Sequence, residues 1–139
     1  MSKQEEFAIK ERYYNEAISY MNDAKKYLKK ADNGSEFYDE SDIEYVQEAC
    51  GIACHGLLTA LDGFLTLKGA HTKGENESKN IEYYQEIIAT MDREMSHCVD
   101  DAHYILYWMG FCNEIYDVAV IEDGFDLAYQ IIDKIKPIK

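Results

Sequence analysis

Apolar residues recur at spacings of three and four positions between about residues 5 and 31, the pattern of one face of an α-helix. The heptad positions of this face are Phe7, Lys10, Tyr14, Ala17, Met21, Ala24, Leu28 and Ala31. Lys10 is their only charged member, and the alanines leave room for a second helix to approach closely. The pair Asn33-Gly34 then predicts the helix end, because both residues tolerate the left-handed backbone found there.

A second heptad series begins near Ser41 or Asp42 and has no charged member. Its positions are Ile43, Val46, Cys50, Ala53, Leu57, Ala60, Phe64 and Leu67. Other apolar residues widen the stripe beyond one seam, so we expect a central helix with neighbours on more than one side. Gly51, Gly56 and Gly63 interrupt this helix with poor helix formers that permit close backbone approach, which favours a buried position.

Three further segments follow. The polar run from His71 to Lys79 predicts one long, mobile loop. The 3-4 spacing then resumes at Ile81 and continues to Met109, and we expect two helices here with a bend or break at about residues 92–96. One continuous, bent helix over residues 79–112 remains the alternative. A last helix is predicted from Val118 to Ile135, just before Pro137.

These elements predict an all-α protein. No stretch alternates in the manner of a β-strand between turn signals, and 8 glycines and 1 proline leave no room for a flexible linker. Long amphipathic helices with short connections pack antiparallel to their neighbours. We therefore expect one domain, residues 1–139, folded as an antiparallel up-and-down four-helix bundle with an additional C-terminal helix.

Charge narrows the choice of partners. The chain carries 14 Lys and Arg against 27 Asp and Glu, a formal net charge of -13. Nucleic acids are bound through clustered cations, so we expect no nucleic-acid binding by the isolated chain. A basic protein is a better match to this charge.

The cysteines and the N-terminal residues indicate the cellular compartment of the protein. The four cysteines lie in apolar helical stretches without a CxxC spacing, as reduced thiols in a core do. The first ten residues have no apolar segment of a secretory signal, and the apolar stretches are broken before they reach the length of a membrane span. We expect a cytoplasmic protein with no membrane partner.

Three stretches carry a resemblance to a known class of domains. They are CHGLLTALDGFLTLKG at residues 54–69, HYILYWMGFCNE at 103–114 and EDGFDLAYQIIDKI at 122–135. With the long first helix, they make nearly the whole chain resemble HEPN-like domains, the higher eukaryotes and prokaryotes nucleotide-binding class. Within that class the chain looks closest to an uncharacterised bacterial helical family. The resemblance implies a helical bundle and makes a dimer plausible.

The same resemblance raises the question of ribonuclease activity. Many HEPN domains are metal-independent ribonucleases that use an arginine followed, after four to six residues, by a histidine, and two such motifs meet across a dimer. Arg12 has no histidine in that window, and only three residues separate Arg93 from His97. The motif is thus absent or one residue short. A divergent ribonuclease or toxin-antitoxin component stays an alternative, with Arg93 and His97 as its pair.

Other chemistry finds little support in the spacing of reactive residues. His97 and Asp101 share a helix face, but the Glu-x-x-His pairs of di-iron bundles are absent. Cys98 is adjacent to His97, and adjacent helical residues point about 100° apart, so they make a poor catalytic dyad. We expect no catalytic residue, no metal and no cofactor.

Tyrosine is unusually frequent, with 12 residues in 139. Tyr13, Tyr20 and Tyr27 recur every seven positions and form a stripe that either flanks the seam within the chain or contacts a partner subunit. A second aromatic cluster consists of Tyr104, Tyr107, Trp108 and Phe111. It is either core or the lining of a small pocket.

Taken together, these features favour a non-enzymatic helical interaction module, a homodimer that also pairs with other proteins. The tyrosine stripe of Tyr13, Tyr20 and Tyr27 is its candidate interface. A binder of nucleotides or other small molecules, using the aromatic cluster, is a further alternative. No glycine-rich phosphate loop supports it, because the glycines of the second helix lie within helical periodicity.

Overall fold

The computed structural model describes residues 1–70 and 80–138, and nearly all of its regular structure is helical. The elements are α1 (Lys3–Ala31), η1 (Glu40–Asp42), α2 (Ile43–Leu67), α3 (Ile81–Met91), α4 (Arg93–His103), η2 (Tyr104–Phe111) and α5 (Val118–Asp133). Within the described residues the only β-type pairing is an isolated bridge between Phe37 and Asp117. The all-α prediction is confirmed, and the predicted loop from His71 to Lys79 lies outside the described residues.

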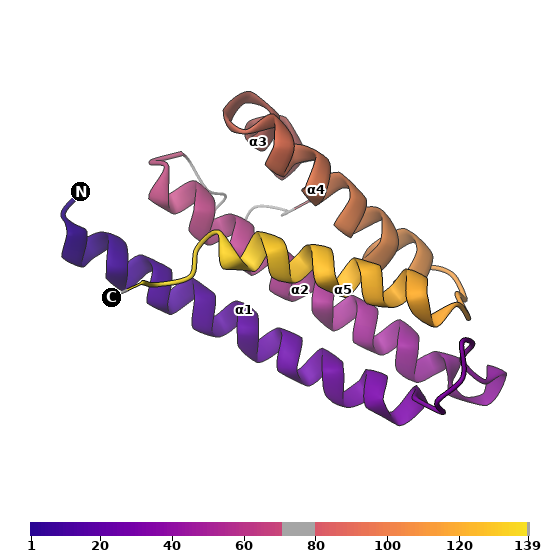
Figure 1. Ribbon diagram of the computed structural model, residues 1–139. Helices are drawn as coiled ribbons and strands as arrows, with labels where there is room; N and C mark the ends of the chain where they lie inside the picture. Colours follow the sequence, from indigo (N-terminus) through magenta and orange to yellow (C-terminus); the bar gives the residue numbers. More distant parts are fainter. Residues whose placement is uncertain (71–79, 139) are drawn as a thin grey trace.

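The first two long helices form an antiparallel hairpin (Figure 1). The side chain of Ser2 caps α1 by accepting a hydrogen bond from the backbone N–H of Glu5. The helix ends at Ala31 as predicted, and Gly34 has a φ of +76°, the left-handed conformation that glycine adopts without steric cost. The buried residues of α1 are Ala17, Met21, Ala24 and Ala31. All four belong to the predicted heptad face.

The helix α2 is the central element, as its apolar pattern predicted. It contacts α1, α5 and η2, and most of its second half is buried. The expectation that the apolar stretches fall short of a membrane span was wrong, because the segment Glu40–Leu67 has the length and hydropathy of a membrane-spanning helix. In the structure, 61% of its most apolar window is buried. Its apolar character is therefore explained by neighbours on several sides.

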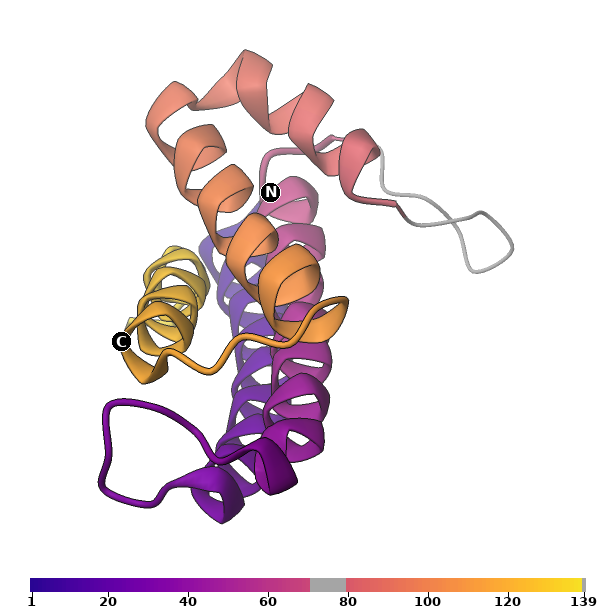
Figure 2. The same cartoon turned by 90° about the vertical axis from the view of Figure 1, so that its right-hand side faces the viewer.

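Four helical segments alternate in direction: α1, α2, α4 together with η2, and α5 (Figure 1). The C-terminal helix α5 contacts α1, α2, α4 and η2, so it lies within the bundle. The shorter α3 packs mainly on α4, and only Tyr84 and Ile88 are buried in it. The helix that is additional to the four alternating segments is therefore α3. The sequence pattern had instead predicted that the C-terminal helix would be the additional one. Figure 2 shows α3 lying across the bundle.

The segment after Asn80 resolves into two helices, as expected. Asp92 leaves the helical conformation with φ -153° and ψ 101°, and its carboxylate accepts a hydrogen bond of 3.0 Å from the backbone N–H of Met95. Asp92 thereby ends α3 and caps α4. The helix α4 then continues directly into η2, which is a π-helix of 8 residues. Such widened turns are rare and occur often at functional sites.

Candidate functional site

The π-helix η2 exposes four large aromatic side chains, which we call the aromatic face. Their exposed fractions are 59% for Tyr104, 39% for Tyr107, 55% for Trp108 and 45% for Phe111. Soluble proteins rarely leave so many neighbouring aromatic residues in water, and a contiguous exposed apolar patch commonly marks a binding surface. The aromatic face is therefore the strongest candidate for a functional surface.

A hollow of about 490 Å³ lies beside this face, between α2, the start of α3 and η2. It is lined by Glu48, Gly51, Ile52, Cys54, His55, Leu58, Asn80, Ile81, Glu82, His103, Tyr107, Trp108 and Phe111. Its volume falls in the range of small-molecule sites, and its wall is mostly apolar with a few polar groups. Three residues of the predicted aromatic cluster thus line a pocket, while Tyr104 lies outside it.

The rings of η2 are ordered by contacts with one another. The Tyr107 ring stacks on His103 at 5.0 Å between ring centroids and on Phe111 at 5.9 Å. Trp108 meets Tyr107 edge to face at 6.2 Å with an interplanar angle of 85°. The ring planes of Tyr107 and Trp108 are therefore nearly perpendicular, and the faces of the Tyr107 ring are turned towards His103 and Phe111.

The wall formed by α2 depends on a glycine. A Cβ atom at Gly51 would lie 2.7 Å from the ring of Phe111, so glycine is needed for this ring to rest against the helix. One turn further on, His55 stacks on Tyr20 of α1 at 5.8 Å between centroids. The sequence correctly indicated close approach at the glycines of α2, but it gave no sign that an exposed ring would be the neighbour of Gly51.

A buried hydrogen bond helps to hold the wall formed by α3. The hydroxyl of Tyr84 donates to the carboxylate of Asp62 at 2.7 Å, and both side chains are buried. Burial and this hydrogen bond raise the pKa of Tyr84, so the hydroxyl keeps its proton. The bond fixes the start of α3 against α2 and thereby the position of Ile81 and Glu82 in the wall.

The charge of the lining is acidic. Glu48 and Glu82 contribute carboxylates, and neither Lys nor Arg is among the described residues that line the hollow. Burial lowers the pKa of His103 from its ordinary value of 6.5, partly opposed by the nearby Asp100. His103 is therefore neutral at pH 7, and the hollow favours a cationic occupant.

Two buried thiols in this region, those of Cys50 and Cys54, are held in the protonated form. Burial raises the pKa of Cys54, which lines the hollow, to about 12, and that of Cys50 to about 12 as well. The thiolate is the reactive form of cysteine, so both residues pack as small apolar groups at neutral pH.

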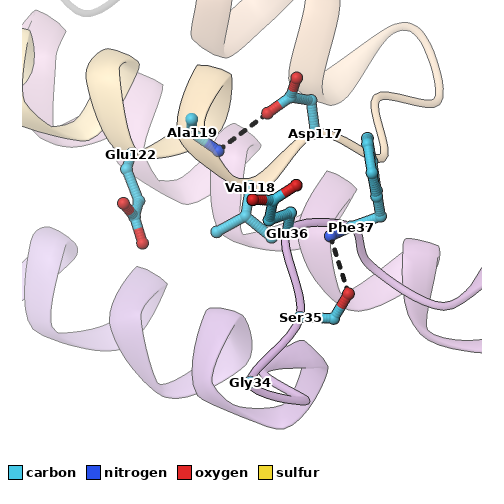
Figure 3. A pocket seen from close by; sticks show the side chains of 8 residues that line it. All are labelled: Gly34, Ser35, Glu36, Phe37, Asp117, Val118, Ala119 and Glu122. Carbon is cyan, nitrogen blue, oxygen red and sulfur yellow. Dashed lines mark hydrogen bonds between the residues drawn. The ribbon is translucent and has the colours of Figure 1, made fainter.

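A second hollow, of about 480 Å³, lies between the loop after α1 and the start of α5 (Figure 3). Its polar groups mostly support the backbone. The Asp117 carboxylate caps α5 by accepting a 3.0 Å hydrogen bond from the N–H of Ala119, and the N–H of Val118 donates to the Glu36 carbonyl at 3.0 Å. The hollow therefore marks the place where the two segments are joined, and it has less apolar wall than the hollow beside η2.

The predicted tyrosine stripe lies along α1 beside α2. All three tyrosines are half-buried, and the Cβ atoms of Tyr13 and Tyr20 lie where Gly63 and Gly56 lack side chains. The ring of Tyr27 is covered by the Lys30 ammonium at 5.1 Å. These contacts place the stripe at the flank of the α1–α2 seam, and a contact with a partner subunit remains a prediction.

The predicted nuclease pair lies elsewhere. Arg93 is the first residue of α4, and His97 follows one turn later, both exposed and outside the lining of the hollow beside η2. In residues 1–70 and 80–138 no three His, Cys, Asp or Glu side chains come together in a way that would hold a metal ion.

The fold and this site define an all-α bundle with an open aromatic pocket. Residues 12–137 match the family described as a domain of unknown function, DUF5618, and the chain belongs to that family. It is also similar to a solved protein of unknown function from Dyadobacter fermentans, with 25% identity, 97% of each chain covered and a TM-score of 0.65. No curated protein matches. The predicted relationship to an uncharacterised bacterial family is confirmed, whereas the likeness to HEPN domains stays a prediction.

Proposed function

We propose that this protein is a non-enzymatic interaction module that binds a basic protein partner through the aromatic face and the adjoining hollow. The exposure of Tyr104, Tyr107, Trp108 and Phe111 on one short π-helix carries the proposal. Aromatic residues with partly exposed rings are typical anchors of protein interfaces, because they bury much apolar area with few rotatable bonds.

Charge favours a basic partner over a second copy of the chain. The net charge is -13, so two copies repel each other at low ionic strength. Glu48 and Glu82 add local negative charge beside the aromatic rings. A basic partner gains from the same charges, and attraction of this kind speeds association and excludes acidic competitors.

The proposal is tested by placing a photo-reactive phenylalanine analogue at Tyr104 in cells. Met91 is the matched control position, because its side chain is 41% exposed and lies at the junction of α3 and α4. We expect a protein of net positive charge to be cross-linked from position 104 and not from position 91. The purified partner should then bind the native chain and lose binding to Trp108→Ser. Equal cross-linking from both positions, or capture of acidic proteins only, contradicts the proposal.

A homodimer through the same face is the second candidate. Trp108 is exposed and lines a hollow on the same surface, so two copies related by a two-fold axis could each place this ring in the hollow of the other. Light scattering over a concentration series at low and high salt tests it, and salt should strengthen the dimer by screening repulsion. Loss of the dimer in Trp108→Glu would assign it to the aromatic face. Loss in Tyr20→Glu, with the helical circular dichroism intact, would assign it to the tyrosine stripe.

A further inference from the structure

We propose that the hollow between α2 and η2 is a cage for an arginine side chain of the basic partner. This inference rests on the proposed function and adds the chemical group that the site recognises. The guanidinium group would lie against the rings of η2 and pair with the carboxylates of the hollow.

The rings provide the first requirement of a cation cage. A cation is attracted to the face of an aromatic ring, most strongly to tryptophan, and arginine does so more often than lysine. Trp108 and Tyr107 line the hollow with their ring planes at 85° to each other, and Tyr107 stacks on His103 and Phe111, so Trp108 provides the ring face for a cation. A planar guanidinium can stack on the Trp108 ring beside the edge of Tyr107.

The carboxylates provide the second requirement. Glu48 comes from the first half of α2 and Glu82 from the first turn of α3, so the two charges belong to different elements of the wall. Both side chains are exposed, and the one ion pair within residues 1–70 and 80–138 joins Lys26 to Asp23. The fork of an arginine matches a carboxylate with two parallel hydrogen bonds, which a lysine cannot form.

The cations among residues 1–70 and 80–138 leave these rings uncovered. Over the described residues, cations of this chain lie above the rings of Tyr13, Tyr27, Tyr45, Phe64 and Tyr129. None of these pairs uses a ring of η2. The aromatic rings next to the acidic hollow therefore have no cation of the described residues above them.

The protein offers a direct reporter of occupancy. Trp108 is its single tryptophan and lines the hollow, so its fluorescence responds to this site without background from another indole. We would titrate the native chain with a short acetylated and amidated peptide that contains one arginine. Matched peptides would carry citrulline, which keeps the shape and loses the charge, or lysine, which keeps the charge and loses the fork.

We expect saturable binding of the arginine peptide, about tenfold weaker binding of the lysine peptide and weaker binding still of the citrulline peptide. The double variant Glu48→Gln, Glu82→Gln should weaken arginine binding about tenfold or more. Glu16→Gln, an exposed change on α1, serves as the charge control and should bind as the native chain does. Thermal unfolding of each variant verifies the fold.

Several results would overturn the cage. Equal binding of the arginine and citrulline peptides would identify a neutral apolar site, and equal losses in the hollow variants and Glu16→Gln would identify a general charge effect. If a basic partner is cross-linked at position 104 but binds the Glu48, Glu82 double variant normally, the cage is wrong and the interaction module stands. If no basic partner is cross-linked and no peptide binds, both the interaction module and the arginine cage are wrong.

Discussion

The side of α2 that faces α1 is closed, whereas the side that borders η2 and the start of α3 contains an open hollow. Towards α1, the glycines at 56 and 63 bring tyrosine Cβ atoms so near that an added Cβ would lie 3.3 Å from Tyr20 and 2.6 Å from Tyr13. Towards η2, Gly51 receives the ring of Phe111, which remains 45% exposed beside the hollow. The same residue type therefore permits close helix packing on one side and shapes a hollow, the proposed binding surface, on the other.

The two sides of α2 differ in what lies behind the side chain that contacts the glycine. On the α1 side, the buried Ala17, Met21 and Ala24 continue the seam, so displacement of a side chain strains a packed interior. On the η2 side, a displaced ring moves into water. Substitutions on the α1 side of α2 should therefore affect stability, and substitutions on the η2 side should affect binding.

The largest expected effect is that of Gly63→Val. The new side chain meets Tyr13 and the Ile135 side chain within 3.0 Å, and overpacking of this kind costs about 1–3 kcal/mol, even though a helical glycine is itself unfavourable. Urea unfolding measures the loss. Gly51→Val is the matched change on the open side and should cost less, because Phe111 can swing outwards. Equal losses would contradict the contrast between the two sides.

Tyr84→Phe should come next, with a loss of about 1–2 kcal/mol in the free energy of unfolding. It removes the 2.7 Å hydrogen bond to Asp62 that holds α3 against α2. Because α3 forms one wall of the hollow, binding at the aromatic face should weaken as well. Tyr104→Phe is the control: its hydroxyl lies on an exposed ring, and urea unfolding should leave its stability unchanged. A stable Tyr84→Phe variant would show that other contacts hold α3.

The pH dependence of stability should be smaller. Burial lowers the pKa of His103, with Asp100 partly opposing, so the unfolded chain takes up the proton more readily than the folded one. The free energy of unfolding should therefore fall as the pH drops from 7 through 6.5 and below. Urea unfolding at several pH values should show a weaker fall for His103→Gln. His97→Gln, which retains His103, should keep the native dependence.

The smallest effect on stability is expected for Trp108→Ser. The side chain is 55% exposed, and substitutions at such positions usually change the free energy of unfolding by no more than about 0.5 kcal/mol. Binding of the partner should nevertheless be lost. A large loss of stability would mean that Trp108 belongs to the core, and the aromatic face would lose its functional meaning.

Much of the fold followed from local patterns. The end of α1 at Ala31, the interruption at Asp92 and the central place of α2 were all predicted, because heptad spacing and helix-ending residues act over a few turns. The position of α5 inside the bundle was not predicted. Helices α3 and α5 both have an apolar stripe. Such a stripe predicts that the helix packs against other helices, but it does not predict which ones.

The candidate site was only partly predictable. The sequence singled out Tyr104, Tyr107, Trp108 and Phe111 as a cluster, but it favoured a place in the core over the lining of a pocket. The π-helical turns of η2 decide which rings share a surface, and no local signal marked them. Glu48 and Glu82 join these rings only because α2 and α3 meet beside η2.

The sequence by itself determined the helices, their amphipathic faces and the acidic charge, because each depends on residue type and on spacing within a few turns. Only the tertiary structure decided which aromatic residues are buried and which are left in water. That outcome depends on which helices lie against each other, and such contacts join residues far apart in the chain. The glycines of α2 are the clearest case: the sequence predicted close approach at all three, and only the fold made Gly56 and Gly63 part of a seam and Gly51 part of a pocket.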